Sequence, residues 1–412
     1  MGSGGREHAL AWKLADEGHQ IDTAPGNPGI ASLSECHAVS ALDLAGMVLL
    51  CRNIQPHLVL IGPEDPLIAG LADELRDNGF VVFGPGRDGA RLEGSKAYSK
   101  EIMVRAGVPT ADSGTFTEAT AAIAFASACA VQGRGVVIKA SGAALGKGVV
   151  VCDDMAQATA AIEAALVDRV FGEAGSTVVV EERLNGREFS LITLCSDGEY
   201  WSLPVAQDYK RIFDEDKGPN TGGMGSYSPV PWVDEELVRR TEALVVKPVL
   251  EELAERNISY RGVLFSGLML VDSELYCLEY NVRFGDPETQ SIMARLGPGL
   301  GEALLACALG EPIPPVPMLE NAAVTVVAAS AGYPASSHKG DVITVGPMPA
   351  GCHCFHAATA HRDGSQVTNG GRVLAITASG DSQTAARTLA YQGLARVRFS
   401  GMQFRRDIAA CL

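Results

Sequence analysis

The sequence predicts an α/β fold divided among two or three domains. The chain has 412 residues, more than one domain usually holds, and 47% of them are hydrophobic, as in ordinary soluble globular proteins. Short apolar runs in its N-terminal part are each followed by a turn rich in glycine or proline and then by a helical pattern. This alternation is typical of parallel sheets that are covered by helices.

The charge and the cysteines exclude several classes of partner. A net charge of −16 lacks the positive field that nucleic acid or an anionic membrane surface requires. The 10 cysteines show no paired spacing, and no uninterrupted apolar run reaches the length of about 20 residues that spans a bilayer. We therefore expect a cytoplasmic protein with reduced thiols and small-molecule substrates, without nucleic-acid or membrane partners.

A glycine-rich turn followed by a helix is the first predicted element. Gly2, Gly4 and Gly5 precede an apolar helical pattern that begins at Ala9. Glycines before a helix N-terminus commonly receive phosphate. A tight turn without a ligand accounts for them equally well.

The next elements predict a small doubly wound domain over residues 1–94. An apolar strand at 57–61 ends in a turn with Glu64 and Asp65, and a second strand follows at 80–83. Ligands bind at the carboxyl ends of parallel strands, so both acids are candidates to lie near substrate. Asp65 is equally well explained as the N-cap of a helix over 66–76.

A second domain is predicted from residue 95. A capped helix there carries Lys96 and Lys100, and a strand at 136–139 leads into a loop of small residues whose amides can approach phosphate. Lys139 and Lys147 bracket this loop with positive charge. No helix opening with GK[ST] follows, so the loop is not a Walker loop, and a plain glycine hairpin is the alternative.

Acidic residues end the strand predicted at 177–182. As an edge strand it would offer backbone hydrogen bonds to an adenine, while Glu188 beyond the following turn would take ribose hydroxyls. A charged hairpin is the alternative. The later segment 213–231 is dense in Gly, Pro, Asn and Ser, and its length predicts a binding loop without regular structure.

The segment CLEYNVRFGDPETQ, at residues 277–290, carries the strongest chemical signal. In a strand, Glu279, Asn281 and Arg283 project from one face. Carboxylate and amide oxygens suit Mg²⁺, and a nearby arginine can hold a phosphate bidentately. A solvated edge strand is the alternative, but the acidic turn at 285–288 favours a reaction centre.

The rest of the chain predicts a helix from 290 to about 309, a proline-rich connection at 311–317, and a C-terminal domain. In that domain strands alternate with turns, and a helix over 381–396 covers them.

Eight segments together resemble the glycinamide ribonucleotide synthetase (phosphoribosylamine-glycine ligase) family of ATP-grasp enzymes. They are GSGGREHALAWKL, GPEDPL, LEGSKAYSK, IKASGAALGKGVVV, VVEERLNGRE, GPNTGGMGSYSP, LEYNVRFGDPETQ and TNGGRVLAITASG. The resemblance implies an N-terminal doubly wound (pre-ATP-grasp) domain over 1–94. It also implies an ATP-grasp domain over 95–310 with a mobile lid at about 114–185, and a mixed α/β domain over 319–412.

The family activity implied is ATP-dependent ligation of glycine to 5-phosphoribosylamine through glycyl phosphate, in de novo purine biosynthesis. By resemblance, the nucleotide contacts are Lys96 and Lys139, the adenine contacts Glu181, Glu182 and Leu184, and the ribose contact Glu188. Glu279 and Asn281 are similar to the ligands of Mg²⁺ or Mn²⁺. The catalytic candidates are Arg283, Asp286 and Lys147, and the substrate candidates are Gly4, Gly5, Asn27, Glu64, Asn220, Thr221 and Gly222. A monomer is expected.

The chain departs from the family pattern in its lid. Ser141, Ala143 and Leu145 stand where many members have Asp, Leu and Ala, and Tyr209 stands where His is frequent. Another ATP-grasp carboxylate-amine ligase is the main competing function, although GPNTGGMG and RFGDPE argue against it. A dinucleotide-binding dehydrogenase would use the glycines at 2–5, but the acidic partner that it requires has no strand-end context.

A strand is expected to be missing before the first glycine turn. Family members have a short apolar strand there, whereas only Met1 precedes Gly2. A central parallel strand is buried on both faces, so its loss forfeits roughly 1.5 to 3 kcal/mol per buried side chain. We expect a gap or an exposed apolar groove beside residues 57–61, a lowered melting temperature and weakened use of phosphoribosylamine.

Overall fold

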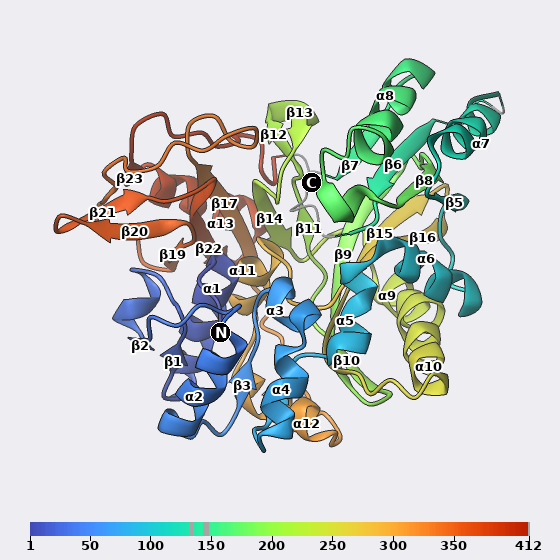
Figure 1. The fold of residues 1–412 in the computed structure, drawn as a ribbon. Helices are drawn as coiled ribbons and strands as arrows, with labels where there is room; N and C mark the ends of the chain where they lie inside the picture. The colour runs from blue at the N-terminus through green and yellow to red at the C-terminus, as the bar shows by residue number, and fades with distance from the viewer. Residues whose placement is uncertain (132, 134, 143–147, 411–412) are drawn as a thin grey trace.

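Two separate parallel strand pairs with surrounding helices form the N-terminal part of the chain, blue in Figure 1. The computed structural model describes residues 1–131, 133, 135–142 and 148–410. β1 pairs in parallel with β2, and β3 pairs in parallel with β4. The elements are α1 (Gly5–Asp16), β1 (Asp22–Thr23), η1 (Ile30–Ser32), β2 (Glu35–Cys36), α2 (Leu44–Ile54), β3 (Val59–Leu60), α3 (Glu64–Ala69), α4 (Leu71–Asp77), β4 (Val82–Phe83) and α5 (Arg87–Gly94).

The expected groove beside residues 57–61 is present. A cavity of about 580 Å³ opens next to β3, and its lining includes Met1, Leu58 and Leu60. The expected effects on melting temperature and substrate use stay predictions.

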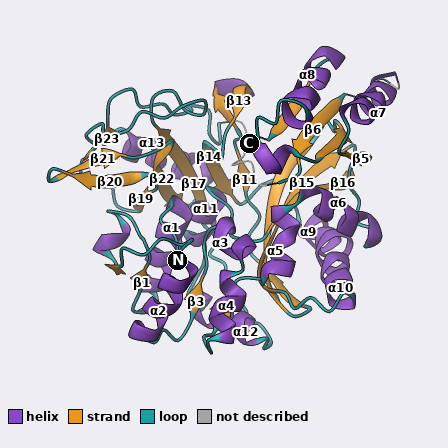
Figure 2. Ribbon diagram, in the orientation of Figure 1, coloured by secondary structure: helices purple, strands orange, loops and turns teal. Residues whose placement is uncertain are grey.

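The next segment forms a small antiparallel sheet with two helices on it, at the upper right of Figure 1. Figure 2 shows α7 and α8 lying together beside its strands. They enclose a core of their own that includes Ala126, Ile138 and Ile162. After α6 (Lys96–Arg105), the elements are β5 (Ser113–Phe116), α7 (Ala119–Val131), β6 (Val136–Ala140), β7 (Val149–Cys152), α8 (Met155–Leu166), η2 (Gly172–Gly175) and β8 (Val178–Glu182).

The strand that ends in Glu181 and Glu182 is not an edge strand, so that expectation was wrong. β8 lies between β5 and β6 in the order β5-β8-β6-β7. Glu181 pairs with Ser113 on one side and with Val137 on the other. Long-range pairing of this kind is set by tertiary packing and is not encoded in a local pattern.

A larger antiparallel sheet, in the order β10-β9-β15-β16, follows in the chain. α12 packs against β9 and β15, and the buried residues Leu194 and Leu264 lie at its core. The elements are β9 (Arg187–Ser196), β10 (Glu199–Ser202), α9 (Glu235–Thr241), η4 (Glu242–Val246), α10 (Lys247–Glu255), β15 (Arg261–Val271), β16 (Glu274–Asn281), α11 (Glu288–Met293) and α12 (Leu300–Leu309).

Two predicted helices are each divided in the structure. The helix expected over 66–76 is broken at Gly70, whose φ of 91° lies in the left-handed region. Asp65 therefore lies in the first turn of α3, and Pro63 is the N-cap residue. The helix expected from 290 to 309 is α11 and α12, separated by a segment that contains Gly299 with φ 113°.

The segment predicted as an irregular binding loop contains strands. Those beyond Asp208 are β12 (Arg211–Phe213), β13 (Lys217–Asn220) and β14 (Gly225–Ser228), with η3 (Asp214–Asp216) between the first two. β12 and β13 form a hairpin, whereas β14 joins β11 (Gln207–Asp208) and the C-terminal sheet. Glycine and proline density marked this segment as a turn region, but pairing with distant strands overrides that local signal.

The C-terminal sheet has the order β11-β14-β17-β22-β19, and α13 packs on β17 and β22. Its buried centre includes Val326 and Ile376, which face each other across β17 and β22. The elements are β17 (Ala322–Ala329), β18 (Thr344–Val345), β19 (Cys352–His356), β20 (Thr359–Arg362), β21 (Ser365–Thr368), β22 (Arg372–Gly380), α13 (Gln383–Leu394) and β23 (Val397–Arg398). None of the helices among the described residues is long and apolar enough to span a bilayer.

Candidate active site

Most of the predicted site residues line one cavity of about 780 Å³. Its walls come from the small sheet with α7 and α8, from the β9–β16 sheet, and from α3 and α6. The predicted residues that line it are Glu64, Lys96, Lys139, Glu181, Glu182, Leu184, Glu188, Asn220, Thr221, Gly222, Glu279, Asn281, Arg283 and Asp286. Segments from three parts of the chain thus meet at a single concave site, as ligand sites usually require.

The predicted metal-ligand pair lies at the end of β16. Glu279 and Asn281 are alternate residues of this antiparallel strand, opposite Gly267 and Phe265 of β15, and both line the cavity. Among the described residues, none donates a hydrogen bond to the Glu279 carboxylate or forms an ion pair with it. An unpartnered carboxylate beside an amide oxygen is a donor set that suits Mg²⁺ or Mn²⁺.

Lysines surround the Glu279 carboxylate. Burial alone would raise the pKa of Glu279, but Lys210, Lys139 and Lys96 hold it below its ordinary value. Burial also lowers the pKa of Lys96, although its charged form is favoured by Glu279. The cavity therefore presents an ionised carboxylate within a field of positive charge, an arrangement that suits a polyanion with a bound cation.

Glu181 forms ion pairs with two of the cavity lysines. Its carboxylate lies 2.8 Å from Lys139 Nζ and 3.3 Å from Lys100 Nζ. Lys139 Nζ also donates to the Leu278 carbonyl, at 3.2 Å. The Glu181 side chain is committed to these lysines, and its backbone lies in an interior strand between β5 and β6. Leu184, beyond the end of β8, lines the cavity and is free of this pairing.

Arg283 lies between two carboxylates. Its Nη2 is 2.9 Å from Glu93 Oε1, and its Nε is 3.2 Å from Glu64 Oε2. Burial raises the pKa of Glu93 to about 7, against the opposing charge of Arg283. Burial also opposes ionisation of Glu64, but Arg283 and Arg6 lower its pKa to about 2. The guanidinium plane is thus fixed from two sides at the cavity wall.

The acidic turn meets the first glycines of the chain. A Cβ added at Gly5 would lie 3.8 Å from Asp286 Oδ1, and one added at Gly4 would lie 3.7 Å from Asp286 Oδ2. Asp286 Oδ1 accepts a hydrogen bond from Gln290 Nε2 at 2.8 Å, and Arg372 Nη2 lies 3.4 Å from Oδ2. Burial alone would raise the pKa of Asp286, but Arg372 and Arg6 hold it below its ordinary value.

The predicted ribose contact, Glu188, pairs with a lysine. Its Oε2 accepts from Lys210 Nζ at 2.6 Å. Nearby, burial raises the pKa of Asp208 to about 7, and Glu288 and Glu188 add to this effect although Lys210 opposes it. Burial likewise raises the pKa of Glu288. At this end of the cavity Asp208 therefore binds a proton near neutral pH, beside Glu288, whose pKa is also raised.

Replacing Asp208 with asparagine is expected to change how stability depends on pH. The pKa of about 7 compares with an ordinary value of 3.8, so the folded chain binds more protons than the unfolded chain between these pH values. The free energy of unfolding therefore falls as the pH rises through this window. Asp208→Asn removes this decrease in the free energy of unfolding. The difference in that free energy between the variant and the parent should therefore be more favourable to the variant at pH 8 than at pH 5, by on the order of 1 to 3 kcal/mol.

Urea unfolding at both pH values, with EDTA present, measures this difference. The matched control is Asp272→Asn, in the exposed turn between β15 and β16. The same stability difference at both pH values for Asp208→Asn would contradict the expectation.

Three predicted residues in the described part of the chain, Gly4, Gly5 and Asn27, do not line this cavity. Asn27 is buried, and its amide donates to the carbonyls of Ser3 and His356 while its oxygen accepts from Gly29 and Ile30. These bonds give it a structural role, and its contact with substrate stays a prediction. Lys147 lies outside the described residues.

Sequence reasoning assigned no role to several charged residues at this site, among them Glu93, Lys100, Asp208, Lys210 and Arg372. Glu93 and Lys100 sit in helical patterns, and Lys210 sits in a polar stretch, so nothing local marks them. Arg372 follows the two glycines of the TNGGRV segment and donates to the carbonyls of Gly222 and Asp286. That glycine pair is the one local signal that could have directed attention to Arg372.

Comparisons with known proteins agree on one family. Three Phosphoribosylglycinamide synthetase models match this chain, namely the N domain over residues 1–93, the ATP-grasp (A) domain over 94–289 and the C domain over 323–411. The Phosphoribosylamine--glycine ligase of Nostoc sp. is 45% identical over 419 residues, which cover 99% of this chain and 97% of that protein. The Phosphoribosylamine--glycine ligase of Streptomyces coelicolor is 43% identical over 419 residues, which cover 100% of this chain and 98% of that protein.

A solved structure agrees with these matches. The crystal structure of Phosphoribosylamine--glycine ligase from Thermotoga maritima superposes with a TM-score of 0.86 at 34% identity, covering 99% of this chain and 98% of that one.

Proposed function

The chain belongs to the phosphoribosylglycinamide synthetase family, and from that premise we propose how the cavity carries out the family reaction. The chain is a phosphoribosylamine-glycine ligase, an ADP-forming carbon-nitrogen ligase of purine biosynthesis. It joins glycine to 5-phosphoribosylamine with ATP and yields glycinamide ribonucleotide, ADP and phosphate. The observation that carries our assignment of the site is the Glu279 carboxylate at the end of β16, which has no ion-pair partner among the described residues and lines the same cavity as Lys96, Lys139 and Lys210.

The reaction needs activation of a carboxylate. A glycine carboxylate oxygen attacks the γ-phosphorus of ATP, ADP leaves, and glycyl phosphate forms. The amine of phosphoribosylamine then attacks the acyl carbon, loses a proton and releases phosphate, which carries away one original carboxylate oxygen. The acyl phosphate hydrolyses readily, so the site must hold both reactants and exclude water.

The nucleotide side of the cavity is assigned to the lysine wall. Lys96 and Lys139 would bind the phosphates, with Lys139 oriented by Glu181. Glu279 and Asn281 would hold Mg²⁺ or Mn²⁺, which neutralises phosphate charge when bound. The adenine would lie against residues 182–184, where Leu184 lines the cavity beyond β8, and Glu188 would take the ribose hydroxyls.

The acceptor side is assigned to the junction of the acidic turn with the N-terminal glycines. Asp286 is ionised and held by Gln290 and Arg372, so it can accept a hydrogen bond from the attacking amine. Gly4 and Gly5 would approach the phosphate of phosphoribosylamine at the N-terminus of α1. The remaining substrate contacts on this side are assigned to Glu64, Asn27, Asn220, Thr221 and Gly222. Lys147 is assigned to closure over the triphosphate.

Oxygen tracing tests this function most directly. Glycine labelled with ¹⁸O in its carboxylate should transfer one ¹⁸O to the released phosphate, in a reaction that requires ATP, glycine and freshly made phosphoribosylamine together. If phosphate release proceeds equally well when another amine replaces phosphoribosylamine, the chain is a different carboxylate-amine ligase. Unlabelled phosphate in the complete reaction would exclude the glycyl phosphate route.

Replacing Gly5 with alanine is expected to raise the KM for phosphoribosylamine by about tenfold or more and to leave the KM for ATP unchanged. The added Cβ would lie 2.8 Å from Gln290 Nε2, the group that holds Asp286. A displaced Gln290 would shift Asp286, the residue assigned to the amine, so phosphoribosylamine should be held less well in its reactive position. Gly346→Ala is the matched control, because its nearest neighbouring atom would lie 3.6 Å away. Equal KM values for phosphoribosylamine in Gly5→Ala and the parent would remove Gly5 from the acceptor site.

A further inference from the structure

We infer that Lys100 and Thr110 position the Glu279 carboxylate for its metal ion, because they hold the backbone of β16 at a β-bulge just before Glu279. This role rests on the proposed function, in which Glu279 is a metal ligand. Thr110 lies outside the lining of the cavity, so it acts as a positioning residue.

The Glu279 side chain has no partner that fixes its direction. In the part of the chain that the structure describes, no residue donates a hydrogen bond to its carboxylate or forms an ion pair with it. The side chain lies over Gly267 of β15, because a Cβ added there would be 3.2 Å from Glu279 Cγ and 3.8 Å from Oε1. The direction of the carboxylate therefore depends on the backbone that carries it.

A β-bulge distorts that backbone directly before Glu279. Gly267 of β15 pairs with Glu279, whereas the next residue, Leu268, pairs with Cys277. Leu278 is thus an extra residue on β16. Bulges next to active sites re-aim side chains, but an interrupted ladder leaves backbone groups that need other partners.

Two lysines that share one carboxylate supply partners for the bulge. Glu181 Oε1 lies 3.3 Å from Lys100 Nζ, and its Oε2 lies 2.8 Å from Lys139 Nζ. Lys139 Nζ donates to the Leu278 carbonyl at 3.2 Å. Lys100 reaches the preceding carbonyl, that of Cys277, through one intervening side chain.

That side chain is Thr110. Lys100 Nζ donates to Thr110 Oγ1, and this hydroxyl donates in turn to the Cys277 carbonyl at 2.7 Å. The Cys277 N–H donates to the Pro109 carbonyl at 2.7 Å. β16 is the last strand in the order β10-β9-β15-β16, so residues 109–110 satisfy backbone groups on its outer edge. We call the two hydrogen bonds from Lys100 to the Cys277 carbonyl the Lys100–Thr110 link.

The two lysines have different tasks. Lys139 is assigned to the phosphates of ATP in the proposed function. The Lys100 side chain is 6% exposed, and its ammonium group is already engaged by Glu181 and Thr110. Lys100 is therefore the lysine that can hold the bulge whatever Lys139 binds.

Calorimetric titration with AMPPNP, an ATP analogue that resists hydrolysis, tests the inference. The Kd is measured with Mn²⁺ and again with EDTA, and the ratio of the two values is the gain in affinity from the metal. Thr110→Val removes the hydroxyl at nearly constant shape. It should raise the Kd with Mn²⁺ by at least about tenfold and change the Kd with EDTA by less than about twofold. Thr110→Ser keeps the hydroxyl and should retain the parent Kd in both media.

Thr241→Val is the matched control. The Thr241 hydroxyl also donates to a backbone carbonyl, that of Leu237 at 2.8 Å, but it lies buried in α9 and outside the Lys100–Thr110 link. Both valine variants leave a carbonyl without its donor, so both should have a lower Tm. Only Thr110→Val should have a higher Kd with Mn²⁺. An equal rise in Thr241→Val would assign the effect to general destabilisation and overturn the inference.

A second variant keeps the test valid if Thr110→Val fails to fold. Lys100→Met breaks the link and also removes a positive charge from the cavity wall. That charge repels a cation, so its loss alone would strengthen Mn²⁺ binding. We expect the opposite, a smaller gain in affinity from Mn²⁺ than in the parent, because the bulge loses its support. An equal or larger gain would overturn the inference.

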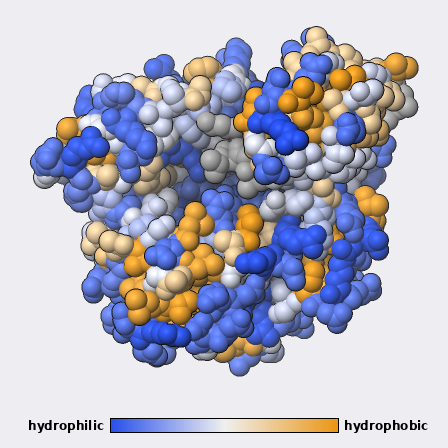
Figure 3. Space-filling model, in the orientation of Figure 1, coloured by the Kyte–Doolittle hydropathy of each residue, from blue (hydrophilic) through white to orange (hydrophobic). Residues whose placement is uncertain are grey.

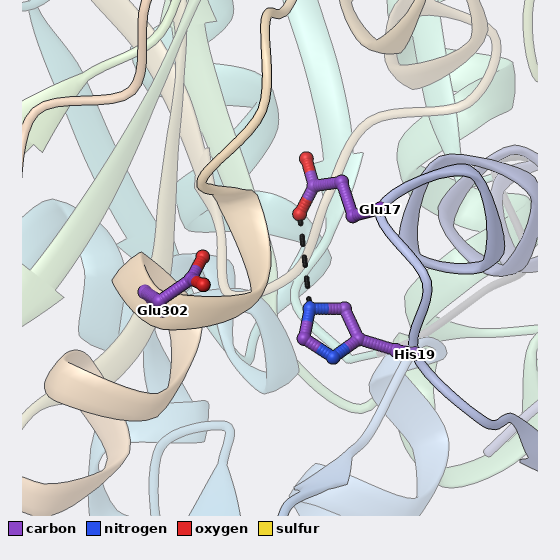
Figure 4. A group of neighbouring side chains, drawn as sticks. All are labelled: Glu17, His19 and Glu302. Atoms are coloured by element: carbon purple, nitrogen blue, oxygen red, sulfur yellow. Dashed lines mark ion pairs between the residues drawn. The ribbon is translucent and has the colours of Figure 1, made fainter.

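Mn²⁺ that binds elsewhere does not enter this measurement, because the nucleotide is titrated. The net charge is −16, and Figure 3 shows hydrophilic side chains over most of the visible face, so Mn²⁺ also associates with the surface. Figure 4 shows a separate group of acidic and imidazole side chains, Glu17, His19 and Glu302. Glu17 is engaged by Lys13 at 3.2 Å and by two backbone N–H groups at the start of α12, so we assign no metal to this group. Glu302→Gln should leave both Kd values unchanged.

Glu279→Ala separates failure of this inference from failure of the proposed function. If Glu279→Ala keeps the full gain from Mn²⁺, Glu279 is not a metal ligand, and the metal assignment and the inference are both wrong. If Glu279→Ala loses the gain while Thr110→Val keeps it, the inference alone is overturned. A rise in Kd for Thr110→Val that is equal with Mn²⁺ and with EDTA would place its effect on the nucleotide and overturn the inference as well.

Discussion

Replacing Glu279 with alanine is expected to reduce ATP turnover by about a thousandfold or more while the chain stays folded. The carboxylate has no ion-pair partner among the described residues and faces Lys210, Lys139 and Lys96 across the cavity. Loss of a charged ligand from a phosphate and metal cluster costs about 4 kcal/mol of transition-state stabilisation, which corresponds to that factor. The Glu279 side chain is only half-buried and lines the cavity, so the Tm should change by only a few degrees.

The matched control is Glu274→Ala on the same strand. Glu274 lies at the far end of β16, with its side chain 72% exposed beside Arg240, and its loss should leave turnover unchanged. Steady-state ADP formation as a function of Mg²⁺ or Mn²⁺ concentration measures both variants. Near-native turnover of Glu279→Ala with unchanged metal dependence would refute its assignment as a ligand.

Local periodicity was sufficient to predict that Glu279 and Asn281 lie on one face of a strand. Glu279 and Asn281 share a face because side chains alternate along a strand, and this holds wherever the strand is paired. The same reasoning identified the capped helix at Lys96, where Ser95 Oγ accepts from Tyr98 N at 3.2 Å. Chemistry that depends on spacing within one element is therefore readable from the sequence.

Contacts between distant segments could not be predicted in this way. Asp286 is held by Arg372, 86 residues further along the chain, and it adjoins Gly4 and Gly5 at the N-terminus. Glu93 pairs with Arg283 although it sits in an ordinary helical pattern. These pairs arise from the packing of α1, α5 and β22 around the acidic turn, which no local pattern specifies.

Breaks within elements were missed for a related reason. Gly70 divides a helix whose apolar pattern continues across it. The position of β8 was missed too, because its pairing with β5 and β6 makes it an interior strand. The resemblance to a family suggested roles for single residues, whereas the structure shows which other side chains those residues contact. Glu181 is the clearest case, because its side chain is committed to Lys100 and Lys139.

Replacing Arg283 with lysine is expected to lower kcat by about a hundredfold or more with little change in the KM for ATP. The guanidinium uses separate nitrogens for Glu93 and Glu64, at 2.9 Å and 3.2 Å. A single ammonium group cannot reproduce this planar fork, so one carboxylate would lose its partner. Glu93, whose pKa burial already raises to about 7, would then bind a proton more readily. On the proposed role of Arg283, its positive charge would then no longer be held beside the transferred phosphoryl group.

Arg261→Lys provides the control for this substitution. Arg261 also pairs with a carboxylate, Asp197 at 2.6 Å, but it begins β15 outside the cavity lining. Phosphate release at varied ATP concentration, with Tm measured in parallel, separates the two roles. A rise in the KM for ATP at constant kcat would make Arg283 a binding residue. If Glu93→Gln restored kcat in the Arg283→Lys chain, the loss would instead come from the uncompensated Glu93 carboxylate. On the proposed role the phosphoryl group requires the Arg283 guanidinium, so removing the charge at residue 93 should not restore kcat.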